Sequence, residues 1–239
     1  MKTLHINAPG PQEIAKISQH MKGLAEQVVF LGGAVVPLLV TDPLIMRFRE
    51  TLDVDLIIKL ASRMAHVELE EKLRDLHFTH DTSPGAPICR WRIEGIRVDI
   101  MPIDESILGF SNRWYPFAFD TAVPIQFPDG PPIRVISPVA FIATKLEAFR
   151  SPSREYHDDY FASHDLEDLL TVIDGRVELN GEIATSSADV RTYLSTGIKR
   201  LLEEPDFRDA LPGHVETGPT NAARTAMLLE QLEQLANLN

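Results

Sequence analysis

The chain has 239 residues, a net charge of −12 and a hydrophobic content of 44%. This length allows a sizeable core in one domain or in two small ones. A single cysteine, Cys89, excludes an internal disulfide and a cysteine-based zinc site, and it favours a reducing, cytoplasmic setting. The most apolar stretch, 28–40, is short and interrupted by glycines and Pro37, so no membrane span is expected.

The negative charge is unevenly distributed. Residues 1–150 hold 16 lysines and arginines against 18 acidic residues, whereas residues 151–239 hold 7 against 17. Such a chain is a poor general binder of nucleic acid, because neutralised phosphates supply most non-specific affinity. The first half still contains arginines that could surround a phosphorylated ligand or simply be solvated, namely Arg47, Arg49, Arg90, Arg92, Arg97 and Arg113.

The first part of the chain alternates helix and strand patterns. Apolar residues at helical spacing predict a helix over 11–26, followed by a buried strand over 28–31. After Gly32 and Gly33, a helix over 34–39 would aim its first N–H groups at an anion. A basic connector over 44–52 then leads to a strand that carries Asp53 and Asp55.

The middle of the chain predicts further strands. A helix is expected over 62–76, with Met64, Val67, Leu69, Leu73 and Leu76 as its apolar positions, and a loop over 80–87. Strands over 88–93 and 96–103 are joined at Glu94-Gly95, which predicts a hairpin, and shorter strands follow at 123–127 and 133–136. The aromatic segment 111–119 could line a pocket, but core is the simpler interpretation.

From Ser137 onward the pattern is helical. Helices are predicted from Ser137-Pro138 to about Arg150, after Ser163, and at about 186–203 and 219–237. The expected fold is therefore α+β. A mixed sheet with flanking helices would form a catalytic domain over 1–137, and an all-helical domain would cover 138–239.

Three aspartates suggest a metal site. Side chains alternate along a strand, so Asp53 and Asp55 project from the same face, and Asp99 lies on a later strand. One Asp-x-Asp pair is expected about once by chance in a chain of this composition. Three carboxylates on adjacent strands after a strand–Gly-Gly–helix unit could instead bind two Mg²⁺, with Mn²⁺ as a substitute, and clamp a triphosphate.

Two other kinds of site are weaker candidates. The pairs His80-Asp81, His157-Asp158 and His164-Asp165 resemble metal ligands of HD-type phosphohydrolases, but their flanking segments do not form the helical bundle that fold requires. Cys89 begins an apolar strand, where a thiol is more often buried and inert than nucleophilic.

Taken together, these motifs resemble the nucleotidyltransferase superfamily with the polymerase-β-type fold. Within it the chain is most similar to the AbiEii/AbiGii-type toxin nucleotidyltransferases of bacterial toxin–antitoxin and abortive-infection systems. The resemblance covers roughly residues 25–175, and the residues that carry it are Gly32-Gly33, Arg49 to Asp55, Arg97 to Asp99, Ser137-Pro138, Lys145 to Arg150, and His164 to Asp168.

The resemblance assigns roles to individual residues. It implies that Asp53, Asp55 and Asp99 bind the metal ions, with Asp99 also able to receive the acceptor's proton. Lys145 would contact the triphosphate or the acceptor, and Asp165 would support the site, with Asp168 as a weaker match. The residues that it implies for nucleotide binding are Gly32, Gly33, Arg49, Thr51 and Lys145.

The chain also departs from the family pattern. Many members have Ser after the glycines, where this chain has Ala34, and the 20 residues from Gly33 to Asp53 exceed the spacing of compact members. No metal ligand is removed by either change. The sequence does not decide which residues contact the nucleotide.

The expected activity is transfer of a nucleoside monophosphate from an NTP to an acceptor, with release of pyrophosphate. The resemblance implies RNA, often the tRNA 3′ end, or a protein hydroxyl as the acceptor, and it allows a cognate antitoxin as partner. A small-molecule enzyme of the aminoglycoside-modifying kind is the alternative, since acidic residues suit a cationic acceptor. A non-catalytic binding protein that retains the fold is the third hypothesis.

Overall fold

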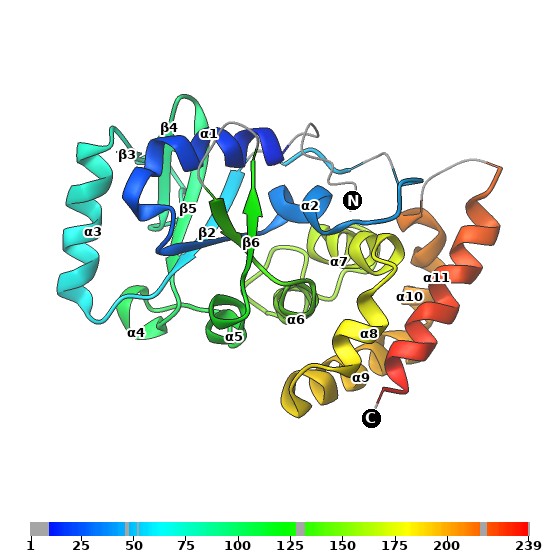
Figure 1. Ribbon diagram of the computed structural model, residues 1–239. Helices are drawn as coiled ribbons and strands as arrows, with labels where there is room; N and C mark the ends of the chain where they lie inside the picture. Colours follow the sequence, from blue (N-terminus) through cyan, green and yellow to red (C-terminus); the bar gives the residue numbers. More distant parts are fainter. Residues whose placement is uncertain (1–9, 46–47, 52, 128–131, 216–218, 239) are drawn as a thin grey trace. The chain divides into compact units, whose positions relative to one another are not determined.

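The computed structural model describes residues 10–238 except 46–47, 52, 128–131 and 216–218 (Figure 1). The chain forms two compact units. The sheet unit contains the described residues of 5–38 and 48–137, and the helical unit contains those of 39–47 and 138–239. The α+β prediction is confirmed, with a mixed sheet first and a mainly helical part after it.

The sheet unit is built around a seven-stranded sheet within the described residues, in the order β3-β4-β5-β2-β1-β7-β6. β1 lies inside the sheet, antiparallel to β2 and parallel to β7, and all four of its residues are buried. β2 in turn runs parallel to β5. The strands are β1 Val28–Leu31, β2 Asp53–Ile58, β3 Thr79–His80, β4 Arg90–Ile93, β5 Ile96–Pro102, β6 Val123–Gln126 and β7 Pro132–Val135.

Short helices surround this sheet. α1 turns Ile14, Ile17 and Met21 into the core, as its spacing predicts, and α5 contacts β1 and β2. The segment after the glycines is only a 3₁₀ turn and one α-helical turn, shorter than a regular helix. The elements are α1 Pro11–Met21, η1 Lys22–Leu24, η2 Gly33–Val35, α2 Val36–Leu39, α3 Arg63–Asp75, α4 Glu105–Leu108 and α5 Tyr115–Asp120.

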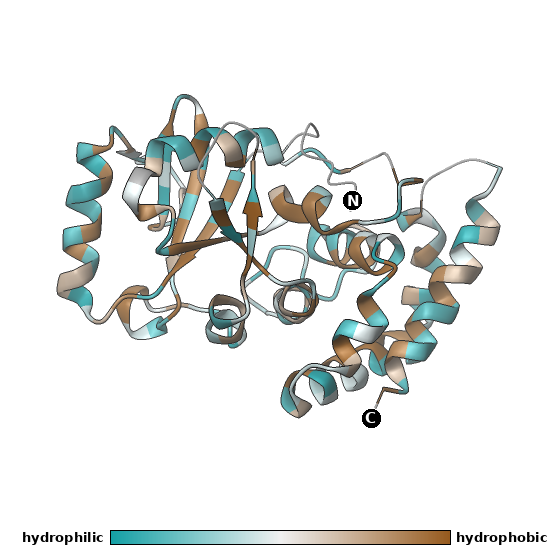
Figure 2. Cartoon of the chain, in the orientation of Figure 1, coloured by the Kyte–Doolittle hydropathy of each residue, from teal (hydrophilic) through white to brown (hydrophobic). Residues whose placement is uncertain are grey.

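The burial of α3 differs from the prediction. Its start is as expected, because the Ser62 hydroxyl accepts a hydrogen bond from the Ala65 N–H at 3.2 Å. Leu69 and Leu73 are buried, one turn apart, whereas Met64 is 67% and Val67 48% exposed. At 3.6 residues per turn these two cannot share the face of Leu69 and Leu73. Figure 2 shows α3 as largely hydrophilic along its length.

The hairpin between β4 and β5 is confirmed. Its two turn residues, Glu94 and Gly95, both have positive φ, 48° and 81°, as a tight two-residue hairpin turn requires. This turn sets the register, in which Ile93 pairs with Ile96 and Arg90 pairs with Asp99. β3 was missed by the prediction, which expected only a loop after His80, because two residues carry no alternation to detect.

The helical unit packs its longest helices directly against one another. α6 contacts α7 and α9, and α11 contacts α9 and α7. The four long helices match the prediction, and the Ser163 hydroxyl caps α7 by accepting a hydrogen bond from the Leu166 N–H at 3.4 Å. The short α8 and α10 were not predicted. The elements are α6 Pro138–Phe149, α7 His164–Gly175, α8 Leu179–Ala184, α9 Ala188–Glu203, α10 Pro205–Ala210, η3 Leu211–His214 and α11 Asn221–Ala236.

The helical unit also includes a segment from much earlier in the chain. The N–H groups of Thr41 and Asp42 donate to the Gly175 carbonyl at 2.8 and 2.9 Å and so satisfy the end of α7. Arg176 donates to the Leu39 carbonyl at 2.7 Å. The predicted limits, 1–137 and 138–239, place these early residues in the other domain. No helix in the described ranges is long and apolar enough to cross a membrane.

Replacement of Arg224 by alanine should destabilise the helical unit. Arg224 joins α11 to α7 by donating to Asp174 at 2.9 Å and to Asp42 at 2.8 Å, and both partners are mostly buried. Burial raises the pKa of Asp174, so its charge becomes costlier to keep once the guanidinium is gone. We expect Arg224→Ala to lower the free energy of unfolding by about 3 kcal/mol in urea titrations. Arg200→Ala, on the exposed side of α9, should change it by less than about 0.5 kcal/mol.

Candidate active site

The three predicted aspartates lie together on the sheet. Asp55 pairs with Asp99 across the parallel strands β2 and β5, and Asp53 pairs with Arg97 in the same register. Residues paired in this way project from the same face, so Asp53, Asp55 and Asp99 form one group, the acidic triad. The alternate residues Val54 and Val98 are buried on the other face.

Gly32 makes room for one member of the triad. Its φ is 75°, a left-handed value that favours glycine, and a Cβ placed on it would lie 1.8 Å from Oδ2 of Asp55. The carboxylate therefore lies directly against the glycine backbone at the end of β1. The glycine motif predicts phosphate contacts for Gly32 and Gly33, and the close approach of the Asp55 carboxylate adds a second reason for glycine at position 32.

Thr51 contacts a second member of the triad, Asp53. Its hydroxyl donates to Oδ1 of Asp53 at 3.2 Å, so it orients a predicted metal ligand in addition to its predicted role in nucleotide binding. Arg49 lies two residues earlier and donates to the Glu50 carbonyl at 3.3 Å. Arg47, another of the arginines considered for phosphate binding, lies outside the described residues.

Arg90 was not predicted as a partner of the triad. Its Nε donates to Oδ1 of Asp99 at 2.8 Å and its Nη2 to Oδ2 at 2.7 Å, which is the two-pronged geometry of a strong arginine–carboxylate pair. Nη2 also donates to Oδ2 of Asp53 at 3.2 Å. The hydrogen bond to Asp99 raises the pKa of Arg90 further above its ordinary value, so this charge is permanent.

The triad has the right donors for a hard divalent cation. Carboxylate oxygens are the ligands that Mg²⁺ prefers, and three carboxylates on adjacent strands can share ions. With the side chains as they lie, no group of three or more His, Cys, Asp or Glu among the described residues is arranged to hold a metal ion. At the triad, the guanidinium of Arg90 donates to both oxygens of Asp99 and to one oxygen of Asp53. Asp53, Asp55 and Asp99 therefore stay predicted metal ligands, and their carboxylate oxygens are the kind of donor that Mg²⁺ prefers.

The helical unit contains the other predicted catalytic residues. Nζ of Lys145, on α6, lies 2.8 Å from Oδ1 of Asp165 and 2.8 Å from Oδ2 of Asp168, both on α7. Burial alone would lower the pKa of Lys145, but the charges of Asp168 and Asp165 outweigh it and raise that pKa. Lys145 is therefore a permanent cation held between two carboxylates, and it cannot act as a general base.

The competing sites receive no support. In the pair His80-Asp81, Asp81 accepts a hydrogen bond from Arg92 at 2.8 Å. In the pair His164-Asp165, Asp165 forms an ion pair with Lys145. Both carboxylates are thus bound by a basic side chain. Cys89 is buried, and burial together with the charge of Asp99 raises the pKa of its thiol to about 12. A neutral, buried thiol is a poor nucleophile.

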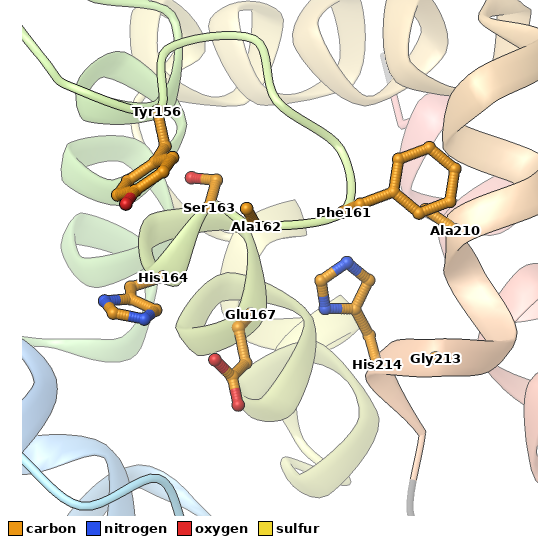
Figure 3. Close-up of a pocket in the computed structure, with 9 residues that line it drawn as sticks. All are labelled: Tyr156, Phe161, Ala162, Ser163, His164, Glu167, Ala210, Gly213 and His214. Atoms are coloured by element: carbon orange, nitrogen blue, oxygen red, sulfur yellow. The ribbon is translucent and has the colours of Figure 1, made fainter.

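A cavity of about 500 Å³ lies within the helical unit, at the beginning of α7. Figure 3 shows Tyr156 and His164 on one side of it and Phe161 on the other, with Glu167 and His214 between them. None of the residues predicted for catalysis lines this cavity. Its nine lining residues are Tyr156, Phe161, Ala162, Ser163, His164, Glu167, Ala210, Gly213 and His214.

No protein-family model matches the chain. No curated protein matches it either.

Replacement of Gly32 by alanine tests the contact with Asp55. The new Cβ would need the position of the Asp55 carboxylate, so we expect a loss of about 3 kcal/mol in the free energy of unfolding, measured in urea. Gly85→Ala is the matched control, since Gly85 has a similar φ of 81° and open space around it. It should cost about 1 kcal/mol. Equal losses in the two variants would show that the contact with Asp55 is unimportant.

The thiol of Cys89 should be nearly unreactive in the folded protein. With a pKa of about 12, only a minute fraction is thiolate at neutral pH, and the residue is also buried. Alkylation by N-ethylmaleimide, followed by mass spectrometry, should be at least about a hundredfold slower in buffer than in urea. Rapid labelling of the native chain would contradict this placement.

Proposed function

We propose that this chain is a metal-dependent nucleotidyltransferase, which moves a nucleoside monophosphate from an NTP to an acceptor and releases pyrophosphate. The observation that carries the proposal is the acidic triad, with Asp53 and Asp55 on one strand and Asp99 opposite Asp55 on the next. The resemblance to nucleotidyltransferases rests on these same residues. The contact between Asp55 and Gly32 supports it further, because it links the glycine motif to the carboxylates.

In the proposed reaction the acceptor hydroxyl forms a bond to the α-phosphorus, and the bond from that phosphorus to the β-phosphate oxygen breaks. Asp53, Asp55 and Asp99 would hold Mg²⁺, which neutralises charge on the phosphates when bound. Thr51 orients Asp53, and Gly32 leaves space for Asp55. Asp99 is the proposed acceptor of the hydroxyl proton, and it can take that proton only when its oxygens are released by Arg90.

Lys145 is proposed to provide a fixed positive charge for phosphate. Its two carboxylate partners hold Nζ at one point and keep it protonated. A protonated lysine suits binding of a phosphate group but not proton abstraction. Asp165 and Asp168 would then be positioning residues that act through Lys145.

The charges around the triad favour an anionic acceptor such as RNA. Arg97 is the register partner of Asp53, and Arg92 pairs with Arg97 on the neighbouring strand, so two arginines flank the triad on the same face. Guanidinium groups bind phosphates well and repel a cationic aminoglycoside. Arg92 also donates to Asp81 at 2.8 Å, so part of its guanidinium is already engaged.

Transfer of label tests the proposed function. The full chain, with Mg²⁺ and each α-labelled NTP in turn, is added to a bacterial extract, and label is measured in the RNA, protein and small-molecule fractions. We expect label in RNA. Asp53→Asn/Asp55→Asn should reduce it at least about a hundredfold, because two carboxylates of the triad lose their charge.

The control is Asp120→Asn, which removes one exposed carboxylate of the sheet unit and should leave the labelling unchanged. Label in the small-molecule fraction would show that the acceptor is a small molecule and not RNA. If no fraction is labelled and the chain does not bind an NTP with Mg²⁺, the proposal is wrong and the chain is a binding protein that retains the fold.

A further inference from the structure

Arg90 holds the oxygens that a metal ion would need. Its side chain is 17% exposed, compared with 11% for Asp99 and 32% for Asp53, so the contact lies in a partly desolvated position. All three of its hydrogen bonds in the triad go to carboxylate oxygens, two of them from the same nitrogen, Nη2. That nitrogen joins Asp99 of β5 to Asp53 of β2.

A divalent cation and this guanidinium compete for the same carboxylates. Mg²⁺ binds carboxylate oxygens directly, at about 2.1 Å, so Asp99 cannot keep both of its oxygens on Arg90 and also be a full ligand. The two cations would in addition repel each other at such short range. Binding of one therefore requires release by the other.

We propose that Arg90 is a displaceable internal counter-ion of the acidic triad. It holds Asp99 and Asp53 in place when no divalent cation is bound, and it leaves them when the cation binds. The inference rests on the proposed function only in taking a divalent cation as the ligand of the triad. Arg90 is a positioning residue in this scheme, since it acts through the two carboxylates.

Charge explains why the protein would need such a residue. Three carboxylates on adjacent strands carry three negative charges within a small volume, and like charges opposite each other on a sheet are destabilising. Arg90 compensates one of them whenever the cation is absent. Because it must be displaced, the same arginine weakens the affinity for the cation.

The test is Mn²⁺ binding to the full chain without nucleotide, measured by the electron paramagnetic resonance signal of free Mn²⁺. Arg90→Gln removes the charge and the two-pronged contact, and we expect it to bind Mn²⁺ at least about tenfold more tightly than the wild type. Arg90→Lys keeps a charge but cannot donate to both oxygens in the same plane, so its affinity should lie between the two.

Thermal unfolding gives a second readout. With EDTA present, Arg90→Gln should unfold at a lower temperature than the wild type, because the triad then loses the positive charge that binds Asp99 and Asp53. Added Mn²⁺ should raise its unfolding temperature by more than it raises that of the wild type.

Arg92→Gln is the matched control. Arg92 lies on the same strand and also donates to a carboxylate at 2.8 Å, but that carboxylate belongs to Asp81, outside the triad. This variant should lose stability with a much smaller change in Mn²⁺ affinity than Arg90→Gln, because Arg92 donates to Asp81 and to no oxygen of the triad in the hydrogen bonds described. A similar gain in affinity for both variants would overturn the inference, because it would then reflect net charge alone.

The remaining outcomes separate this inference from the proposed function. If folded Arg90→Gln and Arg90→Lys bind Mn²⁺ no more tightly than the wild type, Arg90 is not a displaceable counter-ion. The same conclusion follows if neither the wild type nor any variant binds Mn²⁺. If the wild type nevertheless transferred label, the proposed function would stand without it. Tighter binding by Arg90→Gln, with no nucleotidyl transfer by the wild type, would support the counter-ion and overturn the proposed function.

Discussion

Close placement of three carboxylates is the constraint on which the sheet unit depends. Asp55 and Asp99 are register partners, and Asp53 lies on the same face two residues away. Repulsion between them is tolerable only with a cation nearby, and Arg90 supplies one from the adjacent strand. The conformation of Gly32 follows from the same crowding, since the Asp55 carboxylate lies where any other residue would place its Cβ.

The helical unit solves a similar problem with a different cation. Lys145 lies between Asp165 and Asp168, one turn apart on α7, and both carboxylates bind the same ammonium. An ammonium is a compact charge that can be approached from several directions, whereas the guanidinium of Arg90 binds one carboxylate in a fixed plane. The position of Lys145 Nζ is thus fixed by two carboxylates, whereas Arg90 fixes the orientation of the Asp99 carboxylate.

Much of this arrangement could be predicted from the sequence. Apolar spacing and turn residues located the buried strand β1, the hairpin and the long helices, and the alternation along β2 put Asp53 and Asp55 on one face. The pairing of Arg90 with Asp99 was also within reach, because a two-residue turn at Glu94-Gly95 places them opposite each other. The contact of Gly32 with Asp55 was not, since it depends on how β1 and β2 align. The exposed Met64 shows that apolar residues alone do not reveal which face of a helix is covered.

The origin of the helical unit from two separate stretches of the chain affects how it can be made. Residues 39–45 leave the ribosome well before the helices that they join. Their partners in α7 and α11 are synthesised only later. A gene fragment that encodes only residues 138–239 would lack the Leu39 carbonyl that accepts from Arg176 and the Asp42 carboxylate that accepts from Arg224. The helical half made on its own would therefore lose these two hydrogen bonds.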